Sequence, residues 1–167
     1  MFQPPAFLLE LIGFKKTRME ITLPTFDDSG DYAYVMAAMT YALEEFYGLT
    51  FGKKRKLNVQ LVIGEIFLDA IINAARHGNK KNPNKKVLFG CWFGENGILF
   101  GFRDEGKFYS KWKIKELVES RTHILSTDPE GCNAGMEHIY QADSIHVSTT
   151  ENTLYVVVMI ETMILKR

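Results

Sequence analysis

The arrangement that most restricts the fold of this chain is a pair of apolar runs with a very short connection between them. Residues 87–93 and 98–103 are apolar and rich in aromatic side chains, and Glu95-Asn96-Gly97 lies between them. An Asn-Gly pair is typical of a tight β-hairpin turn. Parallel strands need a connection of a dozen or more residues, so two strands joined this closely must be antiparallel. We therefore predict an antiparallel hairpin in the middle of the chain.

Further segments have the patterns of strands and helices. Residues 17–23 alternate between polar and apolar side chains up to Pro24, as a half-buried strand does. Residues 145–149 and 154–164 are separated by a turn at 151–153, and we predict a second hairpin there. Apolar spacing and helix stop signals predict helices over residues 32–46, 57–77, 112–119 and 134–141.

The order of these elements predicts an α+β fold. One strand, two helices, two strands, a helix and two strands suit a two-layer α/β sandwich, with a mixed, mostly antiparallel sheet and helices on one face. The sequence has no βαβ unit with a glycine-rich turn, which argues against a dinucleotide-binding fold. With 167 residues the chain is about one domain long.

We expect residues 1–16 to be an N-terminal extension and residues 17–167 to be the domain itself. The extension is apolar first and basic afterwards, the reverse of the order in a secretory signal. We expect it to pack on the domain or on a partner, and a poorly ordered tail is the alternative.

The charge balance and the cysteines narrow the classes of function. The 20 basic and 20 acidic side chains cancel, which argues against nucleic acid or an anionic membrane as the main ligand. No segment approaches the roughly 20 apolar residues that span a membrane. Cys91 and Cys132 have neither a metal-site spacing nor a disulfide framework, so we expect a cytoplasmic protein.

One predicted helix carries a polar stripe. Glu65, Asp69, Asn73 and His77 recur every four residues within the helix over 57–77, which aligns them along one line while the other faces are apolar. Such a stripe is either the solvent face of the helix or the wall of a polar cavity. A short acid, an amide and an imidazole are less typical of a solvent face than Lys, Glu and Gln, which favours the cavity.

The same helix resembles a known motif. Residues 69–80 read Asp-Ala-Ile-Ile-Asn-Ala-Ala-Arg-His-Gly-Asn-Lys, and Pro83 and two lysines follow before the next strand. This stretch resembles the asparagine box of the GHKL ATPase superfamily (gyrase, heat-shock chaperones, histidine kinases and MutL). Within it, the stretch is most similar to the bacterial anti-sigma-factor serine/threonine kinases, whose box is acid-x-x-x-Asn-Ala-x-x-His-Gly.

The resemblance implies ATP and Mg²⁺ as ligands and assigns two roles on this helix. Asn73 is the implied metal ligand, and an amide oxygen suits Mg²⁺, which prefers oxygen donors. Asp69 is the implied catalytic base, one turn away, and can accept a proton from an attacking hydroxyl. The family usually has Glu where this chain has Asp69.

Two further motifs of the family have partial counterparts. Asp104 and Gly106 follow the strand over 98–103, and the resemblance implies that Asp104 binds the adenine amine while Gly106 lies beside the ring. An ordinary turn has the same Asp-x-Gly pattern. The resemblance also implies that a glycine turn opening a helix binds the phosphates and that a strand hydroxyl supports the adenine site; the residues are Gly131, Gly135, Met136 and Thr153.

The resemblance implies a cytoplasmic ATP-dependent serine/threonine-protein kinase that transfers the γ-phosphate of ATP to a small antagonist protein and binds a sigma factor. A homodimer is implied as well. The alternative is a nucleotide-binding module that acts only by partner capture, since Asp69 and Phe108 depart from the family pattern. A structural domain without nucleotide is the third class.

Overall fold

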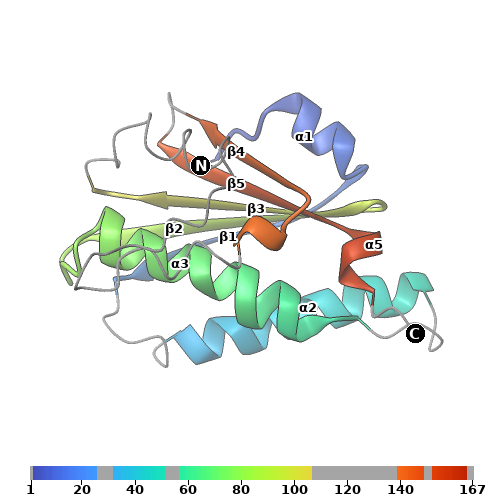
Figure 1. The fold of residues 1–167 in the computed structure, drawn as a ribbon, viewed down its shortest axis with the longest axis horizontal. Coiled ribbons are helices and arrows are strands. Elements are labelled where there is room, and N and C mark those ends of the chain that lie inside the picture. The colour runs from blue at the N-terminus through green and yellow to red at the C-terminus, as the bar shows by residue number, and fades with distance from the viewer. Residues whose placement is uncertain (1, 26–31, 52–56, 107–138, 149–151, 165–167) are drawn as a thin grey trace.

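A five-stranded antiparallel sheet forms the centre of the structure (Figure 1). The computed structural model describes residues 2–25, 32–51, 57–106, 139–148 and 152–164. The order of the strands across the sheet is β1-β2-β3-β5-β4, and each neighbouring pair is antiparallel. The strands are β1 (Phe14–Pro24), β2 (Lys86–Gly94), β3 (Gly97–Asp104), β4 (Ser144–Ser148) and β5 (Thr153–Met159).

Two long helices cover one face of this sheet, which we call the inner face (Figure 1). The first is α2 (Ala33–Phe51). The second is continuous from residue 60 to 78: its middle is the α-helical α3 (Leu68–Asn73), and the flanking segments η2 (Gln60–Phe67) and η3 (Ala74–Gly78) are wound as wider π-helix. Their buried side chains and those of the strands form the main core, so the predicted two-layer α/β sandwich is confirmed.

The opposite, outer face is covered by the N-terminal segment. Helix α1 (Ala6–Leu11) lies on the other side of the sheet from α2 and α3 in Figure 1. Together with the chain around it, α1 builds a second buried cluster on the outer face from Phe2, Leu8, Ile12, Trp92, Leu99, Tyr155 and Val157. Most of the predicted extension therefore packs on the domain, and its last residues already belong to β1.

The β2–β3 hairpin turns one residue earlier than the Asn-Gly pair suggested. The residues between the strands are Glu95 and Asn96, and neither has a positive φ. Their backbone amides donate to the carbonyl oxygens of Gly13 (3.0 Å) and Ile12 (2.9 Å). The turn is therefore held by the connection between α1 and β1 and does not need a left-handed residue.

The prediction for the C-terminal strand was wrong beyond Met159. The chain leaves β5 there and forms one helical turn, α5 (Ile160–Met163). Asp143 accepts hydrogen bonds from the Met159 amide (2.6 Å) and the Thr162 hydroxyl (2.8 Å), and these contacts bend the chain. Of the predicted helix over 134–141, the structure describes only the short turn η5 (Ile139–Gln141), and the predicted helix over 112–119 lies outside the described residues.

Within the described part of the chain, no helix is both long enough and apolar enough to cross a membrane.

Candidate nucleotide site

Asp69 and Asn73 lie one turn apart on α3, between the two π-wound segments. Both side chains are half-buried beneath the inner face of the sheet, so neither lies on an open solvent face. The Asn73 amide nitrogen donates to the Asp69 carbonyl oxygen at 2.8 Å. Ordinary α-winding is kept where these two residues stack, and departures from it on either side are frequent near functional sites.

The hydrogen bond of Asn73 fixes which way its amide faces. A backbone carbonyl can only accept, so the nitrogen must face the helix backbone and the oxygen is directed away from it. An amide oxygen one helical turn from a carboxylate is a suitable donor set for Mg²⁺, which commonly takes one or two protein oxygens and completes its shell with phosphate and water. The oxygens of Asp69 and Asn73 are therefore of the chemical type that Mg²⁺ takes as ligands. Among the described residues, no group of three or more His, Cys, Asp or Glu side chains gathers as a metal site.

Glu65, at the start of the predicted polar stripe, lies in the π-wound segment η2. Its carboxylate accepts a hydrogen bond from the Gln141 amide at 3.2 Å. Glu65 thus links the helix to η5.

Asp104 ends β3 on the same face of the sheet as this helix. Phe100 and Phe102, two and four residues before it, are both in the inner core, so the alternation of the strand directs Asp104 to the inner face. One carboxylate oxygen accepts a hydrogen bond from the Gly106 amide at 2.8 Å. Asp104 and Gly106, predicted to act together, therefore form one turn.

The helix end and this turn touch through glycines. A Cβ added to Gly78 would overlap the carboxylate of Asp104, and a Cβ added to Gly106 would overlap the carbonyl oxygen of Gly78. At Gly106 a side chain would require the backbone to move, and at Gly78 it would displace the Asp104 carboxylate. The structure thus brings the C-terminal end of the helix of Asp69 and Asn73 directly against the Asp104–Gly106 turn.

The carboxyl of Asp104 has a perturbed acidity. Burial removes water from the charged form and raises its pKa above the usual range, while the Gly106 amide and the positive charge of Lys85 act in the opposite direction. A carboxylate that has lost part of its hydration gains from a hydrogen-bond donor on a ligand. Such a donor is offered by an exocyclic amine.

Asn79 is a residue of this region to which the sequence analysis assigned no role of its own. Its side chain is fully buried and donates to the Thr25 hydroxyl (2.7 Å) and the Lys86 carbonyl (2.9 Å), while its oxygen accepts from the Glu105 amide (2.8 Å). The available signal was an Asn just after a helix, which is common at helix ends and does not reveal burial.

Thr153, the predicted support of the adenine site, is fully buried at the start of β5, and the structure does not bring its side chain to that of Asp104. Thr153 pairs with Arg103 across β3 and β5, and its hydroxyl accepts a hydrogen bond from Arg103 Nε at 3.0 Å. Arg103 lies 4.9 Å over the ring of Phe2, on the outer face of the sheet. Because opposite residues of an antiparallel pair share a face, Thr153 lies on the far side of the sheet from Asp104.

Asn152, one residue before Thr153, is the residue of this turn that lies beside Asp104. Its amide nitrogen lies 3.4 Å from the Asp104 carbonyl oxygen, and its backbone has a positive φ of 54°. The predicted phosphate-binding residues Gly131, Gly135 and Met136 lie outside the described residues, as does Phe108.

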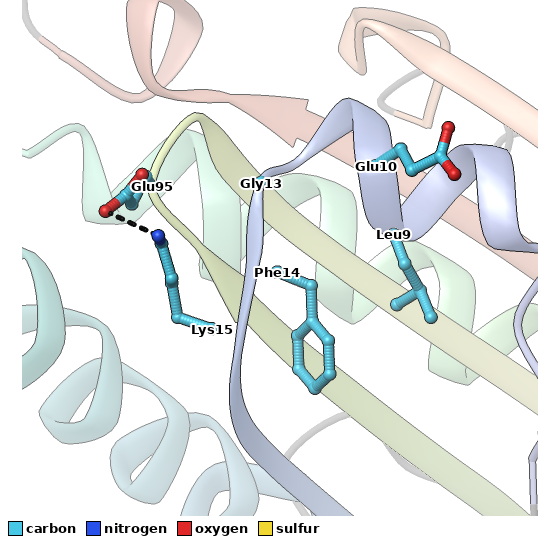
Figure 2. A pocket seen from close by; sticks show the side chains of 6 residues that line it. All are labelled: Leu9, Glu10, Gly13, Phe14, Lys15 and Glu95. Atoms are coloured by element: carbon cyan, nitrogen blue, oxygen red, sulfur yellow. Dashed lines mark ion pairs between the residues drawn. The ribbon is translucent and has the colours of Figure 1, made fainter.

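A separate pocket of about 330 Å³ lies at the other end of β2 and β3, beside the hairpin turn (Figure 2). An ion pair of 3.1 Å between Lys15 and Glu95 closes one side of it. Its lining residues are Leu9, Glu10, Gly13, Phe14, Lys15 and Glu95. None of the predicted site residues belongs to it.

Comparisons with known proteins do not assign this chain to a family. Neither the models of known protein families nor the curated protein sequences contain a match to this chain.

Proposed function

We propose that this chain is a cytoplasmic ATP-binding regulatory protein that resembles the anti-sigma-factor serine/threonine kinases and transfers the γ-phosphate of ATP to a Ser or Thr of a partner protein. The observation that supports the proposal most is the contact of Gly78 with Asp104 and Gly106. It joins the helix of Asp69 and Asn73 to the Asp-x-Gly turn on one face of the sheet, which is the combination that a nucleotide needs.

Each residue has a distinct part in the proposed site. Asn73 holds the metal through its amide oxygen, and Asp104 accepts the amine of the base. Asp69 accepts the proton of the attacking hydroxyl, which is general-base catalysis. Bound Mg²⁺ supplies electrostatic stabilisation of the charge on the phosphates. The partner protein supplies the hydroxyl, and a sigma factor or its antagonist is the proposed kind of partner.

A nucleotide-binding module that works by partner capture is the second candidate, and Asp69 favours it. Aspartate is one methylene shorter than the glutamate usual in the family, and a displacement of about 1 Å in a catalytic group can cost on the order of a hundredfold in rate. Phosphate release from ATP, with and without a candidate antagonist protein and with Asp69→Ala as control, separates the two. Binding without any transfer would support the module.

Thermal unfolding with magnesium-ATP tests nucleotide binding itself. Ligand at 100 times its dissociation constant adds about 2.7 kcal/mol to the free energy of unfolding, which corresponds to a Tm increase of about 5 to 10 °C for a chain of this size. We expect Asn73→Ala to remove most of this increase. Asn96→Ala, an exposed position in the hairpin turn, is the matched control and should keep it. Failure of millimolar magnesium-ATP to raise the Tm of the unaltered chain would contradict both candidates.

A further inference from the structure

The buried amide of Asn79 is the point at which four segments meet. Its nitrogen donates both of its hydrogens, to Thr25 just after β1 and to the carbonyl of Lys86 at the start of β2. Its oxygen accepts the backbone amide of Glu105, just after β3. Its own backbone amide donates to the carbonyl oxygen of Ala74 in the asparagine-box helix, at 2.9 Å. A fully buried amide with three side-chain hydrogen bonds to separate segments has one orientation only.

The hydrogen bonds of Asn79 lie next to the contact between Gly78 and the Asp104–Gly106 turn. Asn79 follows Gly78, whose Cα packs on the Asp104 carboxylate, and Glu105 lies between Asp104 and Gly106. Gly78 and Asp104 are in contact, and the residues that follow them, Asn79 and Glu105, are joined by a hydrogen bond. Any shift of the Asp104–Gly106 turn away from the helix must stretch this bond, which is 2.8 Å long.

The Asp104–Gly106 turn is held by a second hydrogen bond, which is made by the side chain of Glu105 and is weaker than the bond to Asn79. The Glu105 carboxylate accepts the Lys86 amide at 2.8 Å and ties the turn to β2. That contact is exposed and competes with water, whereas the Asn79–Glu105 bond is part-buried and its acceptor residue, Asn79, is fully buried. A hydrogen bond in a buried setting holds its partners more strongly, and leaving one partner unsatisfied there is costly.

On the basis of the proposed ATP site, we infer that Asn79 is a positioning residue, which sets the separation between the helix of Asn73 and the carboxylate of Asp104 and thereby the preference of the site for an adenine nucleotide. Asn79 touches neither the phosphates nor the base in this scheme. It acts through the Glu105 amide, whose neighbour Asp104 reads the base.

Thr25→Val is a control matched to Asn79→Ala. Thr25 is also buried and belongs to the same network, where it donates to the Lys85 carbonyl at 2.8 Å. The change to Val removes one acceptor of Asn79 but leaves the bond to Glu105 in place. Both variants lose hydrogen bonds of this buried network and should unfold at lower temperature. A difference in nucleotide affinity that does not follow the difference in Tm therefore reports positioning and not stability.

The experiment measures the affinities of each folded variant for magnesium-ATP and magnesium-GTP. We expect Asn79→Ala to bind ATP about tenfold or more weakly than the unaltered chain and to lose much of its preference over GTP, because the Asp104 carboxylate is no longer held. Thr25→Val should keep the ATP affinity and the preference over GTP within about threefold, since Thr25 bonds to the nitrogen of the Asn79 amide and Glu105 bonds to its oxygen. Equal affinities and equal selectivity in the two variants would overturn the positioning role.

Two further results keep the test decisive. If the unaltered chain binds ATP and Asp104→Ala does not, but Asn79→Ala retains both affinity and selectivity, the inference fails while the proposed function stands. If the unaltered chain binds no ATP, both fail. Should Asn79→Ala not fold, amide hydrogen exchange of the unaltered chain decides: magnesium-ATP should slow exchange at the Glu105 amide, and unchanged exchange there would overturn the inference.

Discussion

The two faces of the sheet are both buried, but they are covered by segments of very different size. On the inner face, Phe67 of the long helix packs on Phe89, Phe100 and Phe102, with ring centroids 5.0 to 5.8 Å apart. On the outer face, the N-terminal Phe2 packs edge-on against Trp92 at 5.6 Å. The inner layer consists of two long helices, and the outer layer consists of a six-residue helix and the chain on either side of it.

Glycine is used differently on the two faces, and this difference explains where the candidate site lies. On the outer face, Gly90 and Gly101 are directly opposite each other, and a Cβ on Gly90 would overlap the ring of Trp92 and press on Phe2. There the missing side chain makes room for aromatic rings. At the end of the inner face, Gly78 and Gly106 let one backbone approach another backbone and a carboxylate. The second arrangement places the carboxylate of Asp104 against the end of the helix that carries Asp69 and Asn73.

The largest effect in this comparison is expected from Phe67→Ala. The ring is fully buried and contacts three other phenylalanines, so its removal leaves a cavity between helix and sheet. We expect the free energy of unfolding to fall by about 3 to 5 kcal/mol. Denaturant unfolding measures it, with Phe67→Leu as the milder control. A loss below about 1 kcal/mol would mean that the inner face is not the main core.

A smaller effect is expected from Phe2→Ala on the outer face. Phe2 is 4 % exposed and also lies beneath the Arg103 guanidinium, but it is held by a short segment near the chain end. We expect a loss of about 1.5 to 3 kcal/mol in the free energy of unfolding and no change in magnesium-ATP affinity. A large drop in affinity at retained stability would show that the outer face takes part in the site.

The smallest expected effect on stability comes from Asp104→Asn, which should stabilise the fold at pH 7, whereas the two changes above destabilise it. Because the pKa of Asp104 is raised in the fold, the folded chain binds more protons than the unfolded chain, and stability falls as pH rises from about 3.9 through the raised value. An asparagine does not ionise, so the variant does not lose stability in this pH range. We expect its Tm to exceed that of the unaltered chain at pH 7 and to approach it below about pH 3.9, while ATP affinity at pH 7 decreases.

Lys85 is the charged group whose attraction already opposes the raised pKa of Asp104, and it supplies a control. Removing its charge by Lys85→Met should lower the Tm at pH 7 and enlarge the dependence on pH. A variant Asp104→Asn that is less stable at neutral pH would show that the carboxylate stabilises the fold in its charged form, contrary to the direction of the shift.

Much of the fold could be predicted from local pattern. The strand over 17–23, the hairpin strands and both long helices were predicted within a few residues of β1, β2, β3, α2 and the helix over 60–78. The error at the end of β5 has a tertiary cause: Asp143, from another segment, accepts hydrogen bonds from Met159 and Thr162 where the chain leaves the strand. The shift of the hairpin turn has the same origin, since Ile12 and Gly13 hold its amides.

The candidate site could be predicted only in part. The spacing of Asp69 and Asn73 predicted their stacking, because a single α-helical turn decides it. The face on which Thr153 lies could not be predicted, because it depends on how β5 pairs with β3, and a one-residue change in strand register reverses the direction of a side chain. Asn79 was missed because its partners Thr25, Lys86 and Glu105 come from three segments.

Local sequence pattern was enough to predict most of the strands and both long helices, and it shows which side chains the polar helix carries, because periodicity, turn residues and four-residue spacing are properties of neighbouring positions. It did not reveal that the N-terminal segment covers the outer face, that Gly78 meets Asp104, or that a buried Asn79 ties the helix to the turn. These contacts join residues that are distant along the chain. Their geometry depends on how whole layers pack and on which buried polar groups must then be satisfied.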